Sequence, residues 1–142
     1  MTPRAVQAGL NFLHFDLLLV NVPNAMFIYD RTASGNAKPK AVITGPKSGM
    51  ATIDTFKVYP QKNWIVGACS GGAICAWNIF DNGDVPPRWR IPVQQLTGYS
   101  ASGIALDPVH KEIFLSAAGQ VVARPQSGIM NTVITFSWPE IF

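Results

Sequence analysis

The sequence predicts an all-β protein, and three observations lead to that fold class. Short apolar runs recur along the whole chain and alternate with clusters of turn residues. Twelve glycines and eleven prolines are spread over the length, which is enough to separate roughly ten short strands. No stretch shows the periodic apolar spacing of an amphipathic helix.

The composition is that of one core-rich globular domain. Of the 142 residues, 48% are hydrophobic and 13% are charged, so the chain can bury a sizeable core. The net charge is +3, and most of the eleven lysines and arginines are dispersed. Two local pairs, Lys38 with Lys40 and Arg88 with Arg90, fall on expected outer strands. We interpret them as protection of a sheet edge and not as a nucleic-acid surface, which would gather positive charge on one face.

A repeat with a period of 48 residues organises the chain. Strand-like runs begin at Asp16, Trp64 and Glu112, and the register between the repeats largely holds on both sides of these starts. Each period contains about four strand-like runs and no helix. A period of this size predicts a solenoid, a propeller or an array, and four strands per period are typical of a β-propeller blade.

We therefore expect a single domain, residues 1–142, built of three antiparallel blades of four strands each. The segment between Gln120 and Met130 is either a longer hairpin loop or a strand of its own. The blades are expected at about residues 5–44, 50–92 and 100–142, with strands at about 5–12, 16–22, 25–30, 39–44, 50–58, 63–69, 73–79, 88–92, 100–106, 111–117 and 131–137.

The first blade also carries a resemblance. Residues 24–50, NAMFIYDRTASGNAKPKAVITGPKSGM, resemble the blade motif of bacterial NHL-like and YVTN-like propeller proteins, and residues 131–142, NTVITFSWPEIF, resemble their closing strand. In the second blade the motif is weaker, because Asn-Ile-Phe-Asp-Asn-Gly-Asp replaces the Tyr-Asp-Arg loop. The resemblance implies the propeller fold. Members of these families bind proteins, carbohydrates or nucleic acid, or act as lactonases and lyases, so it implies no single function.

Three blades are too few to close a ring, because propellers use about four to eight. An open arc would expose more apolar surface than a soluble monomer tolerates. We expect a tight homodimer that closes a six-bladed ring through its first and last blades, with the N-terminal strand completing the last blade of the partner. An alternative, compatible with the first, is that the chain is the C-terminal half of a longer reading frame.

Two cysteines flank an expected Gly-Gly hairpin turn. The run Gly67-Ala68-Cys69-Ser70-Gly71 has the spacing of a hydrolase nucleophile elbow, but a strand follows it where that motif needs a helix. Cys69 and Cys75 would share a face if the turn has three residues, and lie on opposite faces if it has two. We favour two buried, reduced thiols over a disulfide. We expect no catalytic residue.

No metal or cofactor site is expected either. His14 and His110 occupy equivalent positions two periods apart, but they fall in turns between first and second strands, which radiate around a ring and do not converge. Asp54 falls on a channel-side strand. A lone carboxylate is as often a solvated or hydrogen-bonded group as a general base.

If the ring binds a ligand, geometry places the site at the mouth of the axial channel. The loops there join fourth strands to the next first strands, and second strands to third strands. The polar candidates for ligand binding that these loops supply are Asn24, Lys47, Ser48, Ser70, Gln94, Gln95 and Tyr99.

The sequence thus favours a non-enzymatic binding and assembly module whose partners are a second copy and a small-molecule or protein ligand. The alternative is a lactonase or esterase that uses the channel. We expect neither a nucleic-acid partner nor a membrane partner, since no apolar run approaches the roughly 20 residues of a membrane span. His14 and Asp16 interrupt the first apolar run, so Met1 to Ala25 does not resemble a signal peptide. The default location is the cytoplasm, with export left open.

Overall fold

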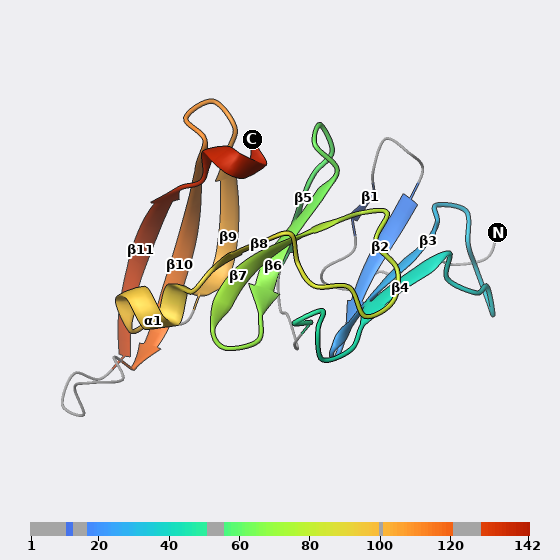
Figure 1. Ribbon diagram of the computed structural model, residues 1–142, viewed down its shortest axis with the longest axis horizontal. Helices are drawn as coiled ribbons and strands as arrows, with labels where there is room; N and C mark the ends of the chain where they lie inside the picture. Colours follow the sequence, from blue (N-terminus) through green and yellow to red (C-terminus); the bar gives the residue numbers. More distant parts are fainter. Residues whose placement is uncertain (1–10, 13–16, 51–55, 100, 121–128) are drawn as a thin grey trace.

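Three antiparallel sheets follow one another along the chain and stand side by side (Figure 1). This computed structural model describes residues 11–12, 17–50, 56–99, 101–120 and 129–142. In each of the three sheets neighbouring strands follow one another in the chain, as in an up-and-down meander. This is the arrangement expected of propeller blades.

The described strands fall in the expected places. The first sheet contains β1 (Asn11–Phe12), β2 (Leu17–Val22), β3 (Ala25–Asp30) and β4 (Ala41–Thr44). The second contains β5 (Phe56–Tyr59), β6 (Trp64–Cys69), β7 (Ala73–Asn78) and β8 (Trp89–Ile91). The third contains β9 (Ala101–Asp107), β10 (Glu112–Gln120) and β11 (Ile129–Ser137).

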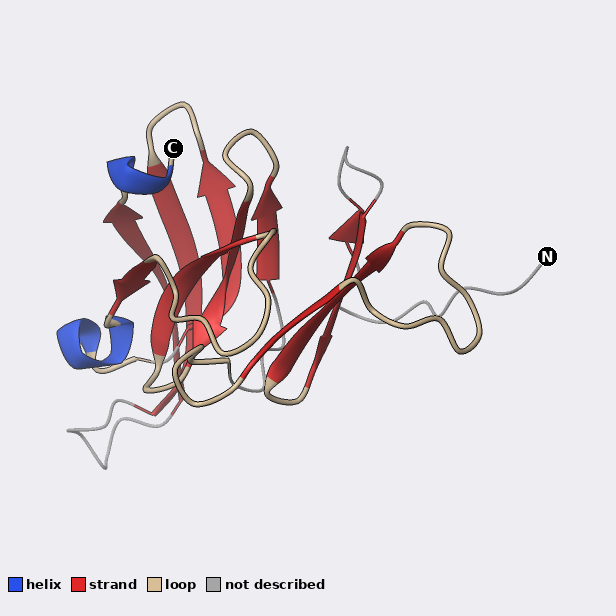
Figure 2. Cartoon of the chain, turned by 45° about the vertical axis from the view of Figure 1, so that its right-hand side comes forward, coloured by secondary structure: helices blue, strands red, loops and turns tan. Residues whose placement is uncertain are grey.

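The structure differs from the expected strands in three respects. A short helix, α1 (Val93–Thr97), follows β8 where no helix was expected, and a 3₁₀ turn, η1 (Pro139–Ile141), follows β11. Figure 2 shows these two helices beside the third sheet, near opposite ends of its strands. The hairpin of β10 and β11 is longer than expected. Residues 1–10, 51–55 and 121–128, which hold parts of the expected strands and the ambiguous segment, lie outside the described residues.

The 48-residue repeat is visible in backbone hydrogen bonds. The N–H of Lys40 donates to the carbonyl of Ile28 at 2.7 Å, and 48 residues later the N–H of Arg88 donates to the carbonyl of Ala76 at 2.8 Å. The turns that precede β6 and β10 both contain a residue with positive φ, Asn63 at 61° and Lys111 at 58°. Equivalent positions therefore share backbone geometry as well as sequence spacing.

The core consists of two apolar layers, one on each side of the second sheet. β7 is buried from Ala73 to Trp77 without alternation, because both of its faces are covered. Cys75 and Trp77 pack against the first sheet, and Ile74 and Ala76 pack toward the third. The indole N–H of the fully buried Trp77 donates to the carbonyl of Ser48 at 2.8 Å, which satisfies its polar group.

A segment of the second sheet closes the outer edge of the first. Residues 82–84, which we call the strap, lie in the loop between β7 and β8 and run along β4. The N–H of Gly83 donates to the carbonyl of Val42 at 2.6 Å, and the N–H of Thr44 donates to the carbonyl of Gly83 at 3.2 Å. The N–H of Val42 donates to Oδ1 of Asn82 at 3.0 Å. The edge that β4 would otherwise expose is thus paired.

The strap ends on a carboxylate that holds the next turn. Oδ1 of Asp84 accepts hydrogen bonds from the backbone N–H groups of Lys47 at 2.8 Å and Ser48 at 2.9 Å. Gly45, at φ 119°, leaves room for this carboxylate, because a Cβ at Gly45 would collide with the Asp84 side chain. Glycine is therefore required at this position by both conformation and space.

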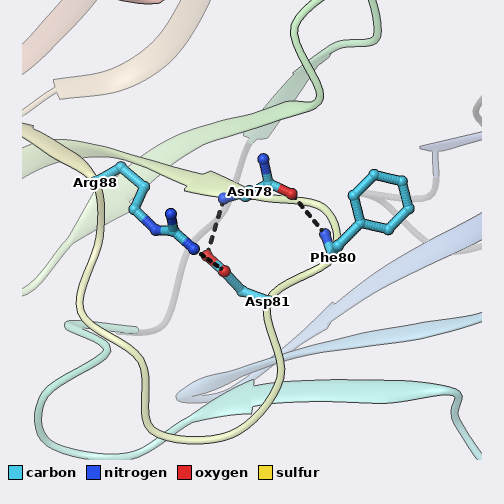
Figure 3. A network of polar contacts seen from close by, with 4 residues as sticks. All are labelled: Asn78, Phe80, Asp81 and Arg88. Carbon is cyan, nitrogen blue, oxygen red and sulfur yellow. Dashed lines mark hydrogen bonds and ion pairs between the residues drawn. The ribbon is translucent and has the colours of Figure 1, made fainter.

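A second polar cluster shapes the loop from which the strap extends (Figure 3). Asp81 is only 6% exposed, and its carboxylate accepts from the N–H of Asn78 at 3.0 Å and from Nη2 of Arg88 at 2.5 Å. Oδ1 of Asn78 in turn accepts from the N–H of Phe80 at 2.9 Å. These bonds join the two ends of the loop between β7 and β8, so they fix the position at which the strap begins.

We predict that Asp84→Ala lowers the free energy of unfolding by about 1–3 kcal/mol, because two backbone donors lose a charged acceptor. Asp30→Ala is the matched control, since it removes an exposed ion pair with Lys40 and should cost about 0–1 kcal/mol. Urea denaturation of both variants measures the difference. Equal losses would show that the strap carboxylate contributes no more than a surface charge.

Candidate functional site

Most of the expected site residues lie on one edge of the molecule, the lower edge in Figure 1. We call residues 45–49, 70–72 and 92–99 the loop rim. The N–H of Ser70 donates to the carbonyl of Gly49 at 2.9 Å, and the N–H of Gln94 donates to the carbonyl of Gly72 at 3.1 Å. Backbone hydrogen bonds thus join three loop segments from two sheets into one surface.

The turn at the centre of the rim needs its glycines. Gly71 has φ 79° and Gly72 has φ 68°, a region that other residues rarely adopt. A Cβ at Gly71 would lie 2.9 Å from Nη2 of Arg90, and one at Gly72 would collide with the side chain of Gln94. Nη2 of Arg90 also donates to the carbonyl of Ser70 at 3.2 Å. The side chains of Arg90 and Gln94 therefore occupy the space beside Gly71 and Gly72 that a side chain at either position would need.

Ser48 is part of the core and not of the surface. It is 0% exposed, and its hydroxyl donates to the carbonyl of Gly45 at 2.6 Å and accepts from the N–H of Met50 at 3.2 Å. Its hydroxyl is therefore occupied inside the protein. The geometry gives Ser48 a role in holding the rim segment.

The other expected residues differ in their access to solvent. Lys47, Ser70 and Gln95 are exposed on the rim. Gln94 is half-buried beside Gly72, and Tyr99 is half-buried after α1. Asn24 is exposed in the turn between β2 and β3, where its carbonyl accepts from the hydroxyl of Thr44.

Sequence reasoning missed three exposed residues near the rim. Arg90 had been assigned to edge protection alone, yet its guanidinium reaches the turn at Ser70. Trp89 is 41% exposed, and Leu96 on α1 is 64% exposed. The alternation Arg88-Trp89-Arg90 on an outer strand is the signal that could have found Trp89 and Arg90, because a large aromatic side chain on that strand has no core to fill. No such pattern marks Leu96.

Cys69 and Cys75 form a disulfide, so the expectation of two reduced thiols is wrong. The turn between their strands has three residues, and the register pairs Cys69 with Ala73 and Gly67 with Cys75. The two cysteines therefore share one face, with Cα atoms 5.8 Å apart, within the range that a disulfide requires. The sulfur of Cys69 is bonded and cannot serve as a nucleophile.

His110 lies in the turn between β9 and β10, away from the loop rim. Its Nδ1 is 2.7 Å from Oδ2 of Asp107, and this hydrogen bond, with the carboxylate charge, raises the pKa of His110 above 6.5. The same bond lowers the pKa of Asp107 below 3.8. The other carboxylate oxygen accepts from the N–H groups of Val109 and His110, so Asp107 organises the turn.

Within the described ranges, no three histidine, cysteine or acidic side chains gather as metal ligands would. His14 and Asp54 lie outside those ranges. No helix in the part of the chain that the structure describes is long and apolar enough to cross a membrane.

Comparison with known proteins identifies the fold. No family profile and no curated protein sequence matches the chain. The β-propeller domain of Myceliophteria thermophila Cps50 (Swd1) is similar in structure, with a TM-score of 0.56 and 14% identity over 94% of this chain and 41% of that one. A chain of a mitotic checkpoint complex has a TM-score of 0.54 and 17% identity over 93% of this chain and 39% of that one.

These similarities show that the three sheets are β-propeller blades. The predicted fold class is thereby confirmed. The chain spans about two fifths of the length of these propeller chains. The identities are too low to transfer a function.

We predict that replacing both Cys69 and Cys75 by alanine lowers the free energy of unfolding by about 2 kcal/mol, the value that loop-closure entropy gives for a short closed loop. Urea titration with and without a reductant provides the measurement. The reductant should destabilise the wild type and leave the double variant unchanged. Two titratable thiols in unreduced, denatured wild-type protein would contradict the disulfide.

We predict that His110 titrates above pH 6.5 in the folded protein. Its contribution to stability is complete below the unfolded pKa and is lost as the pH rises through the raised folded pKa. The contribution of Asp107 is present above its unfolded pKa and is lost as the pH falls through the lowered folded pKa. NMR titration should show that Asp107→Asn returns the pKa of His110 toward 6.5. Glu112→Gln, which removes a weaker charge effect, should retain most of the shift.

Proposed function

We propose that the protein is a non-enzymatic β-propeller module for binding and assembly, which closes with a second copy into a six-bladed ring and binds a ligand or protein at the channel mouth. The loop rim carries this proposal. Its segments are held together by backbone hydrogen bonds before any partner arrives, so binding costs little ordering entropy. Its exposed polar side chains include Lys47, Ser70 and Gln95.

The structural neighbours support a binding role. One of them belongs to a mitotic checkpoint complex, so a propeller of similar shape is used there within an assembly. The lactonase or esterase alternative loses the Gly-x-Cys-x-Gly pattern, because Cys69 is in a disulfide, and keeps only the family resemblance as its motivation. Binding is therefore the function that the described residues support best.

The third sheet supports assembly through its outer edge. The N–H of Trp138 donates to the carbonyl of Lys111, which places these residues in a hydrogen-bonded pair. By the alternation of antiparallel pairing, the backbone groups of Val133, Thr135 and Ser137 point away from β10. β11 contains no charge and no proline, so nothing along it opposes the addition of a strand. In the proposed dimer the N-terminal strand of the second copy takes this place.

The sequence favours a cytoplasmic location and leaves export open. The disulfide weighs against the cytoplasm, because structural disulfides persist mainly in oxidising compartments. Thiol labelling of protein isolated under denaturing, alkylating conditions from its native source tests the compartment. A bridged pair would favour export.

We predict that the protein is a dimer whose thermal midpoint rises with concentration, because dissociation is coupled to unfolding. Sedimentation and light scattering test the assembly. Thr135→Lys should weaken the dimer by placing a charge on the β11 edge, and Ala105→Lys, on an exposed position of β9, is the matched control.

A folded species of 15.4 kDa at all concentrations would contradict the dimer, and a larger ring would contradict the count of six blades. For the binding role, Lys47→Glu should weaken any partner bound at the rim, with Lys62→Glu at the other end of the second sheet as control. Turnover of simple lactones or esters above the uncatalysed rate would contradict a non-enzymatic role.

A further inference from the structure

The molecule contains two equivalent outer strands, of which one is occupied along its edge. β4 and β8 are related by the 48-residue repeat, so Ala41 corresponds to Trp89 and Val42 to Arg90. Along β4, the strap pairs with the N–H and carbonyl of Val42. The equivalent groups of Arg90 point outward in the same way, because both strands meet their third strand in the same register.

In the described residues, no strap covers β8. The segment equivalent to the strap follows β11, and it turns elsewhere. Ile141 is fully buried between the second and third sheets, and the ring of Phe142 meets that of Tyr59 at a centroid distance of 5.2 Å. Aromatic and core contacts therefore hold this segment away from the β8 edge.

The side chains along β8 would supply specific contacts. Trp89 and Ile91 lie two residues apart on β8 and so share the face toward the third sheet. Ile91 packs against that core, whereas Trp89 is 41% exposed. Arg90 lies on the other face, with one guanidinium nitrogen on the carbonyl of Ser70. Arginine can bind a carboxylate with its remaining donors. An extended chain along β8 would thus run between an aromatic side chain and a cation.

We propose that the β8 edge binds an acidic extended segment of a partner protein by strand addition. This inference rests on the proposed binding function and names its surface and partner class. The precedent is the strap itself, whose Asp-Asn-Gly-Asp sequence pairs with the equivalent edge. The edge of β8 offers the N–H and carbonyl of Arg90, while Pro92 has no N–H at the position of Thr44. Side-chain contacts therefore contribute a large share of the affinity.

The strap of a second copy does not fit as the occupant. Residues 82–84 are already paired with β4 of their own chain, and Asp84 is bound to the N–H groups of Lys47 and Ser48. Releasing them would break these bonds. The strap sequence, however, provides the probe.

The test uses a capped synthetic peptide, FDNGDVPP, which copies residues 80–87. NMR titration of the intact protein should shift the amide of Arg90 and the indole of Trp89, and leave the amide of Val42 unchanged. Arg90→Gln should lower the affinity about tenfold, the change expected from loss of one charge-assisted hydrogen bond. Lys62→Gln, an exposed cation in the turn between β5 and β6, is the matched control and should bind normally.

A second variant, together with circular dichroism, separates a loss of binding from a loss of folding. Trp89→Ala should weaken binding severalfold while the circular dichroism spectrum stays unchanged. A peptide in which both aspartates are replaced by lysine should not bind. Equal binding of that peptide, shifts clustered on another surface, or equal loss in Arg90→Gln and Lys62→Gln would each overturn the inference.

Other occupants give distinct results that also overturn it. Shifts of Trp89 that depend on protein concentration without peptide would assign the edge to a second copy, and displacement of the peptide by oligothymidine would assign it to nucleic acid. Failure of the peptide alongside a partner bound at the loop rim would refute the β8 edge and spare the proposed function. Peptide binding by a protein that never forms a ring would refute the ring alone.

Discussion

The second sheet is the constraint on which the rest of the structure depends, because it must serve two cores at once. β7 has no solvent-facing side, and its side chains alternate between the two apolar layers. A one-residue slip of this strand would turn Trp77 toward the third sheet and Ala76 toward the first, so that each layer would receive a side chain of the wrong size. Packing on both faces therefore fixes the register of β7 within the second sheet. The bond from Trp77 to the carbonyl of Ser48 reinforces that register and reaches the loop rim.

Strand positions were predictable because they depend on local chemistry. The period of 48 places turn residues such as Asn63 and Lys111 at equivalent points, and turns of this kind determine where strands begin. The disulfide was not predictable, because it depends on whether the turn at Gly71 has two or three residues. The helix α1 was missed because five residues are too short for a periodic signal.

The candidate site was predictable only as a location. Loops at one end of successive blades must lie near each other, so Lys47, Ser70 and Gln95 could be placed together from topology. Their roles could not be assigned, since the burial of Ser48 depends on its partners within 45–50 and on Trp77, which is 29 residues away. The contact of Arg90 with Ser70 likewise joins positions 20 residues apart. Sequence patterns predict which face of a strand is buried and where turns occur. They do not predict which side chains from distant positions come into contact.

The strap belongs to the second blade and protects the first. The outer edge of the first blade is closed by a loop of the second blade, so this protection runs backward along the chain. During synthesis β4 is complete at Thr44, but its edge has no partner until Asp84 has left the ribosome. For about 40 residues of elongation, which last several seconds, a nascent first blade presents an unpaired strand to other chains. A chaperone that covers β4 in that interval would keep its free edge from pairing with other chains.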